Sequence, residues 1–316
     1  MRVLIVGLGV IGTGYGWAFT EAGHQVTHLL RPGRAAQVAD GIPIDLLDTR
    51  PGHAQTLQAI YRPAVVEALS RYLGADLVMV PVKHYQLADT LRGLALELPD
   101  AHYLLFAANW AGLEAVDAVL PRSQYVWGYS SSTGGHGGDK LVFNMSADYR
   151  CGPIGGEEPS WARNVVDTFA SADVAPDRKP DMREWLWVHF AIAAGMIGAA
   201  LYAGGLRRLM EDEAALRDLM VPAVRESLAV LAARGVDPAA WPDAAPYLTQ
   251  PAAVLAAAAR RSAGSAWVRR TFTAGHFGEN RQEMRRFYLD VLETGEGLGV
   301  ETPVMASLRA RIEGLE

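Results

Sequence analysis

The chain has 316 residues, which is enough for two domains of ordinary size. Hydrophobic residues make up 50% of it and charged residues 20%, a composition that excludes a disordered chain and predicts a sizeable core. The formal net charge of −6 and the absence of any run of more than two consecutive Lys or Arg residues argue against a nucleic-acid-binding surface. A single cysteine, Cys151, excludes an internal disulfide and a cysteine-based metal cluster, so no metal site is predicted.

The first predicted strand is followed by a glycine-rich turn. Residues 3–6 form a continuous apolar run of the kind that a parallel sheet buries on both faces. Gly7, Gly9 and Gly12 complete a GxGxxG spacing: the first glycine allows a tight turn, the second lets a pyrophosphate approach the backbone, and the third lets a helix pack on the strand. The predicted cofactor contacts in this turn are Gly7, Gly9, Val10, Ile11 and Gly12.

A helix and a second strand follow at the spacing of a βαβ unit. The pattern predicts a helix over residues 11–22 and a strand over residues 25–30, and the start of the helix would direct free N–H groups at the phosphates. Gly14 and Gly16 lie inside this helix, where each glycine costs about 1 kcal/mol relative to alanine, so they indicate close packing against an unidentified partner. This context favours a dinucleotide site over a plain tight turn in another α/β fold.

The residues after the second strand indicate which dinucleotide is bound. An NAD site usually has Asp or Glu there to accept hydrogen bonds from the ribose, whereas this chain has Arg31, with Arg34 close by. Two guanidinium groups can bind a 2′-phosphate bidentately. We therefore predict NADP(H) as the cofactor; the alternative is that both arginines are ordinary solvated loop charges.

Polar residues also follow two later strands. Residues 76–82 and 103–107 are predicted to be buried strands, and Lys83 and Asn109 come directly after them. Ligands of open α/β sheets bind outside the carboxyl ends of the strands, so Lys83, Gln86 and Asn109 are predicted to contact the cofactor or the substrate. Lys83 could also be a solvated loop lysine.

The other elements of the first part are less distinct. Residues 42–55 have no assignable pattern, residues 64–72 have helical spacing, and residues 141–145 are predicted to be an outer strand that widens the sheet. A helix is predicted over residues 161–171, and residues 173–180 are rich in proline and charge, as a linker would be. Because the sequence opens on a core strand, with no room for a signal peptide before it, we expect a cytoplasmic protein.

Beyond residue 180 only helical patterns remain. Residues 185–203 contain one strongly polar side chain, His189, and are predicted to be a core helix rather than a membrane span. Further helices are expected over residues 211–234, 252–261 and 282–298. The predicted organisation is α/β: a Rossmann-type doubly wound sheet domain that binds NADP, residues 1–178, and an all-helical substrate domain, residues 179–316. The apolar helices of the second domain would suit a homodimer interface and the core of a monomer equally well.

With these features together, the chain resembles the ketopantoate reductase (2-dehydropantoate 2-reductase) family, within the 6-phosphogluconate-dehydrogenase-like superfamily. The resemblance lies in the glycine turn, Arg31, Lys83 with Gln86, and Asn109. It implies a Rossmann domain followed by a helical domain, and NADPH-dependent reduction of a 2-oxo acid, as in pantothenate biosynthesis.

The resemblance also implies catalytic residues in the helical part. The family has a lysine near a tryptophan early in its first long helix, where this chain has His189; Ala193 and Ile197 stand where the family has asparagines. The family's glutamate is retained as Glu283, and Thr271 stands where a substrate-binding serine is found. We therefore predict His189, Glu283 and Lys83 as catalytic residues, with Asn109 and Thr271 contacting the substrate.

These residues support one main function and two alternatives. The main prediction is an NADPH-dependent reductase of a small 2-oxo acid, in which His189 and Glu283 form an acid/base pair and Lys83 orients the substrate or supplies positive charge. One alternative is an opine- or hydroxyacyl-type dehydrogenase that uses the same His–Glu dyad. The other is an NADP(H)-binding sensor without catalysis, in which His189 would be an ordinary core histidine.

Overall fold

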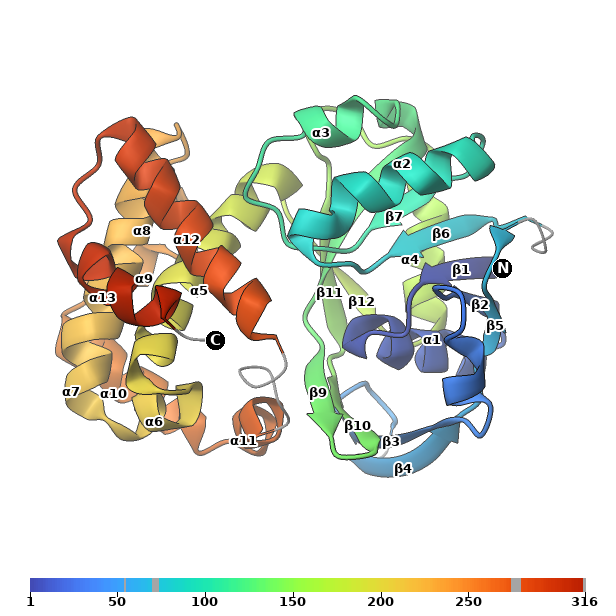
Figure 1. Ribbon diagram of the computed structural model, residues 1–316, viewed down its shortest axis with the longest axis horizontal. Coiled ribbons are helices and arrows are strands. Elements are labelled where there is room, and N and C mark those ends of the chain that lie inside the picture. Colours follow the sequence, from blue (N-terminus) through green and yellow to red (C-terminus); the bar gives the residue numbers. More distant parts are fainter. Residues whose placement is uncertain (54, 70–73, 274–279, 315–316) are drawn as a thin grey trace. The chain divides into compact units, whose positions relative to one another are not determined.

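A computed structural model describes residues 1–53, 55–69, 74–273 and 280–314 of the chain (Figure 1). It divides into two compact units, Met1–Met182 and Arg183–Glu316. The first unit combines strands and helices, and the second is helical, so the predicted fold class is confirmed. The roles assigned to the two predicted domains remain predictions.

The first unit is built on an eight-stranded sheet. Its strands, in spatial order, are β12 (Ala175–Arg178), β11 (Asp148–Gly152), β8 (Tyr125–Ser130), β7 (Tyr103–Leu105), β6 (Leu77–Val80), β1 (Arg2–Val6), β2 (Gln25–Leu29) and β5 (Ala64–Val66). The six strands from β8 to β5 run parallel, whereas β11 is antiparallel to β8. β6 and β7 are buried along their whole length, which explains their uninterrupted apolar sequences.

Helices cover both faces of this sheet (Figure 1). α1 (Val10–Glu21) contacts α4 (Ala162–Ser171), and α2 (Leu87–Glu97) contacts the short α3 (Glu114–Asp117). The predicted helices over residues 11–22 and 161–171 are therefore present within one residue of their expected starts. The short α3 begins at Glu114, five residues after Asn109.

A second, four-stranded sheet was not predicted. Its spatial order is β4 (Thr56–Tyr61), β3 (Ile42–Asp48), β10 (Lys140–Met145) and β9 (Thr133–Gly137). β3 and β10 are parallel, and β4 and β9 pair antiparallel on either side. The stretch without an assignable pattern is thus partly strand, and the strand at residues 141–145 lies in this sheet, not in the main one.

Two further expectations are wrong. Residues 64–66 form strand β5 instead of the start of a helix. The β-branched residues Val65 and Val66 favour a strand, and they pair with the edge of β2 that faces away from β1. The expected linker contains β12, which pairs with β11 at the edge of the main sheet despite Pro176. A proline is tolerated there because an edge strand has one side without partners.

The mid-helix glycines of α1 allow side chains of other elements to lie against its backbone. A Cβ atom added to Gly14 would lie 2.4 Å from the ring of Phe143 in β10, and one added to Gly16 would lie 2.5 Å from Nε2 of His28 in β2. Between them, Tyr15 is completely buried, and its hydroxyl lies 3.1 Å from Oγ of Ser132. α1 therefore fixes the second sheet against the first.

The second unit consists of helices around α5. Its elements are α5 (Met182–Ala203), α6 (Leu206–Glu211), α7 (Glu213–Ala215), a π-helical turn η5 (Leu216–Met220), α8 (Val221–Ala233), α9 (Ala245–Thr249), α10 (Ala252–Ala263), α11 (Ala266–Thr273), α12 (Arg281–Leu298) and α13 (Pro303–Glu313). Among the described residues α5 is the one helix that is long and apolar enough to cross a membrane, but 61% of its most apolar window is buried inside the protein. This burial agrees with the expected core helix.

Two glycines let other helices approach α5 closely. A Cβ atom at Gly195 would lie 2.5 Å from the backbone nitrogen of Val224 in α8, and one at Gly198 would lie 2.6 Å from the ring of Tyr288 in α12. Tyr288 is fully buried and donates a hydrogen bond from its hydroxyl to the carbonyl oxygen of Met305 in α13. The core of this unit thus depends on the absence of side chains from one face of α5.

Substitution of Gly195 by alanine should destabilise the second unit. The added methyl group meets backbone atoms, which cannot rotate away, so we expect a loss of about 1–3 kcal/mol of unfolding free energy, typical of overpacking. Gly297→Ala is the matched control, because Gly297 lies exposed in α12 with no atom within 4 Å of an added Cβ, and should stabilise by up to about 1 kcal/mol. Thermal unfolding measures both; equal effects of the two variants would contradict this packing.

Candidate functional site

The candidate site of the first unit lies at the carboxyl edge of the parallel strands. Gly7 follows β1, Arg31 follows β2, Lys83 follows β6 and Asn109 follows β7. Because these strands are neighbours in the order β7, β6, β1 and β2, the residues after them emerge at the same edge. The structure thus brings the predicted first-unit residues to one edge, and what they bind remains a prediction.

The glycine turn has the geometry that a pyrophosphate requires. Gly7 has φ +85°, a conformation that favours glycine, and no atom lies within 4 Å of a Cβ added at Gly7 or Gly9. A Cβ at Gly12 would lie 3.2 Å from Ile5 and 3.3 Å from Pro81, so the third glycine provides the close packing of helix on strand. The space over the first two glycines is open to a ligand, and the third holds the helix in place.

The start of α1 is free to bind an anion. Its N-cap residue is Gly9, which has no side chain, and no side chain caps the first turn, which includes Val10 and Ile11. The first backbone N–H groups of a helix have no partner within the helix and carry partial positive charge. The turn therefore fits the diphosphate of a dinucleotide.

A histidine that was not predicted as a site residue, His28, contacts the backbone of this turn. His28 in β2 is completely buried; its Nδ1 lies 2.9 Å from the carbonyl oxygen of Gly7, and its Nε2 lies 2.9 Å from the hydroxyl of Tyr61. Burial lowers the pKa of His28 to about 4 and raises the pKa of Tyr61 to about 12. His28 is therefore neutral at pH 7: Nδ1–H donates to Gly7, and Nε2 accepts from Tyr61.

The arginines after β2 lie on an exposed turn. The backbone N–H of Arg34 donates to the carbonyl oxygen of Arg31 at 3.2 Å, and Gly33 between them has φ +80°. Both arginine side chains are exposed, and neither guanidinium forms an ion pair with a residue that the structure describes. The turn therefore offers two positive groups to an anion at the end of β2.

A short 3₁₀ helix, η1 (Ala35–Val38), follows this turn, and a carboxylate anchors its start. The backbone N–H of Ala35 donates to Oε1 of Glu67 at 2.7 Å. Glu67 comes directly after β5, the strand beside β2. Glu67 was not predicted as a site residue because residues 64–72 were expected to be a helix.

Lys83 and Asn109 are partly sheltered by the backbone around them. Lys83 is half-buried and extended, and it precedes the 3₁₀ helix η3 (His84–Gln86), whose last residue Gln86 donates its N–H to the carbonyl oxygen of Lys83 at 2.8 Å. Asn109 is 7% exposed, and its Nδ2 lies 3.4 Å from the carbonyl oxygen of Gly112. The backbone of Lys83 and the side chain of Asn109 thus have defined positions, and their contact with a ligand remains a prediction.

In the second unit, His189 is held by a tryptophan. Its ring is half-buried and stacks on Trp185 one helical turn earlier, with ring centroids 5.1 Å apart, and Trp185 donates from Nε1 to Asp243 at 3.1 Å. Ala193 and Ile197 lie one and two turns further along α5, both half-buried. His189 is therefore on the same side of the helix as the two apolar residues.

The other residues predicted for the second unit are less fully defined. Glu283 is half-buried in the first turn of α12, and Phe287 one turn later stacks on Phe190 of α5 at 4.1 Å. The helices that carry His189 and Glu283 are thus in contact, while the acid/base pairing of these two residues remains a prediction. Thr271 lies in α11, but its side chain is outside the part of the chain that the structure describes.

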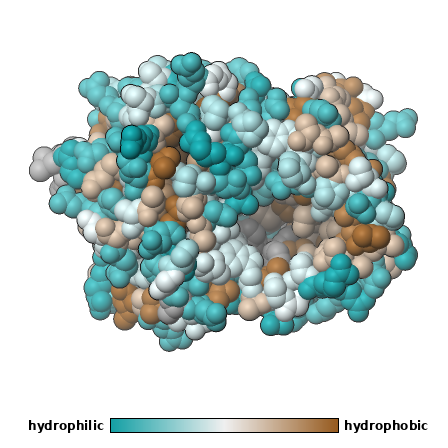
Figure 2. All heavy atoms as spheres, turned by 180° about the vertical axis from the view of Figure 1, so that it is seen from behind, coloured by the Kyte–Doolittle hydropathy of each residue, from teal (hydrophilic) through white to brown (hydrophobic). Residues whose placement is uncertain are grey.

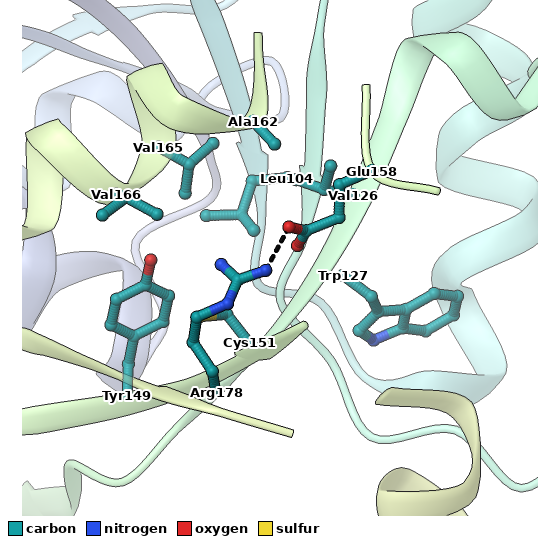
Figure 3. Close-up of a pocket in the computed structure, with 10 residues that line it drawn as sticks. All are labelled: Leu104, Val126, Trp127, Tyr149, Cys151, Glu158, Ala162, Val165, Val166 and Arg178. Carbon is teal, nitrogen blue, oxygen red and sulfur yellow. Dashed lines mark hydrogen bonds and ion pairs between the residues drawn. The ribbon is translucent and has the colours of Figure 1, made fainter. Parts of the chain in front are cut away.

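A small cavity beside β8 and β11 does not suit a cofactor (Figure 3). Its volume of about 10 Å³ is roughly enough for one water molecule. Figure 3 shows the guanidinium of Arg178 paired with Glu158 among the residues that line it, which include Cys151. Burial raises the pKa of the Cys151 thiol, which disfavours the reactive thiolate.

The face shown in Figure 2 and the metal-ligating side chains of the described residues add no second candidate site. On the face shown in Figure 2, hydrophobic residues are scattered among polar ones. No group of three or more histidine, cysteine, aspartate or glutamate residues that could hold a metal ion occurs among the described residues.

Comparison with known proteins confirms the family resemblance over the first unit. Residues 3–153 match the family model described as "Ketopantoate reductase PanE/ApbA". No curated protein matches the chain.

Solved structures share the fold at low sequence identity. The 2-dehydropantoate 2-reductase from Geobacter metallireducens GS-15 has a TM-score of 0.74 and 17% identity, with 100% of both chains covered. A putative ketopantoate reductase from Ralstonia solanacearum MolK2 has a TM-score of 0.73 and 16% identity, with 99% of this chain and 96% of that chain covered. D-mandelate dehydrogenase in a ternary structure with NADH and anilino(oxo)acetate has a TM-score of 0.73 and 14% identity, with 99% and 97% covered. At these identities the likeness shows the fold.

Replacement of His28 by leucine should weaken dinucleotide binding. The carbonyl oxygen of Gly7 would lose its donor, and we expect a roughly 5- to 20-fold higher Kd for NADP⁺, the equivalent of one hydrogen bond that orders the turn. Asparagine can still donate to Gly7, so His28→Asn should recover most of the affinity. Calorimetric titration measures the Kd, and circular dichroism shows whether each variant is folded; a folded leucine variant with unchanged Kd would contradict this role.

Proposed function

We propose that the protein is an NADPH-dependent reductase of a small 2-oxo acid, of the ketopantoate reductase type. The observation that carries this proposal is the convergence of the uncapped glycine turn, Arg31, Lys83 and Asn109 at one edge of the sheet. These residues lie within the segment that matches the ketopantoate reductase family model. We also infer that the protein acts in the cytoplasm.

Different residues of this edge would bind different parts of the cofactor. The N–H groups of the first turn of α1 would hold the diphosphate, and Arg31 and Arg34 would bind a 2′-phosphate with their planar donors. When bound, NADPH supplies the hydride for the carbonyl carbon. The half-buried Lys83 and the buried Asn109, further along the edge, would orient the nicotinamide end and the substrate.

Reduction of a 2-oxo acid also needs positive charge and a proton. Negative charge develops on the carbonyl oxygen during hydride transfer, and a lysine ammonium or an amide N–H stabilises it. We assign this role to Lys83 and Asn109. We assign proton donation to His189, supported by Glu283, because the stack on Trp185 restricts the ring of the one histidine on α5.

The initial rate of NADPH oxidation tests the reaction. The substrates are ketopantoate, aliphatic 2-oxo acids of increasing size and an aromatic 2-oxo acid, each with NADPH and with NADH at pH 6 and pH 8. We expect turnover with NADPH, and a faster rate at pH 6 if protonated His189 donates the proton. Tight NADPH binding without reduction of any of these compounds would contradict the reductase and favour a sensor.

The His189→Ala variant tests, in the same assay, whether His189 itself donates the proton. Loss of a general acid should lower kcat by about 10²- to 10⁴-fold and remove the advantage of pH 6. Trp185→Phe, which keeps an aromatic ring beside residue 189, is the matched control and should change kcat far less. An unchanged rate in His189→Ala would remove His189 from the mechanism.

The double variant Arg31→Ala, Arg34→Ala tests the choice of cofactor. Each charge-assisted hydrogen bond to a phosphate contributes about 1.5–3 kcal/mol, so the KM for NADPH should rise at least 10-fold while the KM for NADH changes little. The control is Arg163→Ala, Arg207→Ala, which removes two exposed arginines from other helices. An equal loss with both cofactors would show that the arginines do not read the 2′-phosphate.

A further inference from the structure

We propose that Glu67 sets how strongly the protein prefers a 2′-phosphate over a 2′-hydroxyl on the adenosine ribose. This inference rests on the proposed binding of a nicotinamide dinucleotide and names a residue that limits its NADP specificity. Glu67 comes directly after β5, beside the arginine turn, and it is not one of the proposed catalytic residues.

The backbone brings Glu67 to the arginine turn. Leu29 of β2 lies opposite Val66 of β5, and the N–H of Leu30 donates to the carbonyl oxygen of Val66 at 2.8 Å. The two chain segments therefore leave the sheet side by side, one toward Arg31 and the other toward Glu67. This pairing fixes the backbone at Glu67 beside the backbone that leads to Arg31.

One hydrogen bond then joins the two segments. Oε1 of Glu67 accepts from the backbone N–H of Ala35 at 2.7 Å, and Ala35 is the residue directly after Arg34. The anchored peptide closes a turn that is already constrained by the bond from Arg34 to Arg31. This N–H, which could otherwise donate to a phosphate, is thus used by the protein's own carboxylate.

The charges at this turn oppose one another. Arg31 and Arg34 contribute two exposed positive charges, and Glu67 places one negative charge beside them. A 2′-phosphate is attracted by the arginines and repelled by the carboxylate, whereas a neutral ribose hydroxyl experiences neither effect strongly. Glu67 therefore lowers the affinity for the phosphorylated ribose selectively.

The charge-neutral variant Glu67→Gln isolates this effect. The amide oxygen of glutamine can still accept from Ala35, so the turn keeps its anchor while the negative charge is lost. Adenosine 2′,5′-bisphosphate and 5′-AMP are the probes, titrated calorimetrically into the full-length protein. We expect an approximately 3- to 10-fold lower Kd for the bisphosphate, as for the loss of a partly screened repulsion near a surface, and an unchanged or higher Kd for 5′-AMP.

Two comparisons show whether charge is the cause. Glu97→Gln removes an exposed carboxylate at the far end of α2 and should leave the ratio of the two Kd values unchanged. Raising the salt concentration from 50 to 500 mM should shrink the difference between Glu67→Gln and the unmodified protein, because salt screens charges but not a change of shape. A difference that persists at high salt would contradict the electrostatic role.

The outcomes also separate this inference from the proposed function. If the unmodified protein binds both probes but Glu67→Gln leaves their Kd ratio unchanged, the role of Glu67 is wrong and the dinucleotide site stands. If neither probe binds, the dinucleotide site is wrong and this inference with it. Since neither probe contains nicotinamide, a protein that reduces no 2-oxo acid would still give the expected shift.

Discussion

The close approach of α1 to both sheets is the constraint on which the first unit depends. Gly12 brings the helix onto β1, Gly14 makes room for Phe143 of the second sheet, and Gly16 makes room for His28. The same helix begins at the glycine turn, so its position decides where the N–H groups of that turn point. Packing and binding are thus set by one element, which explains a glycine content that a free-standing helix would not tolerate.

A buried ion pair joins the second sheet to the main part of this unit. Asp48 and Arg50, whose side chains are each 2% exposed, are 2.7 Å apart, and Arg50 also donates to the carbonyl oxygen of Ala172 after α4 at 2.7 Å. The guanidinium lies 5.6 Å from the ring centre of Trp17 in α1. A buried charge needs such partners, because the cost of removing it from water cancels most of the attraction within the pair. The contacts of Arg50 therefore serve mainly to define how β3 packs against α1 and the end of α4.

The sequence was informative where local pattern decides structure and uninformative where distant partners do. The strands around Gly7, Lys83 and Asn109 are buried on both faces and could be predicted from apolar runs. β3 could not, because Asp45 interrupts its apolar pattern and pairs with Lys140 of β10, 95 positions away, only in the folded chain. His28 and Glu67 were missed for the same reason: their roles come from residues 21 and 32 positions away.

The two sides of α5 give a structural reason to single out His189. Gly195 and Gly198 lie about 180–240° around the helix from His189, on the side where α8 and α12 approach the backbone. Ile192, Ala193 and Ile197 lie on the side of His189 and are half-buried. A histidine needed only for packing would be expected on the closely packed side. Its place on the less buried side, with its ring held by Trp185, favours contact with a ligand.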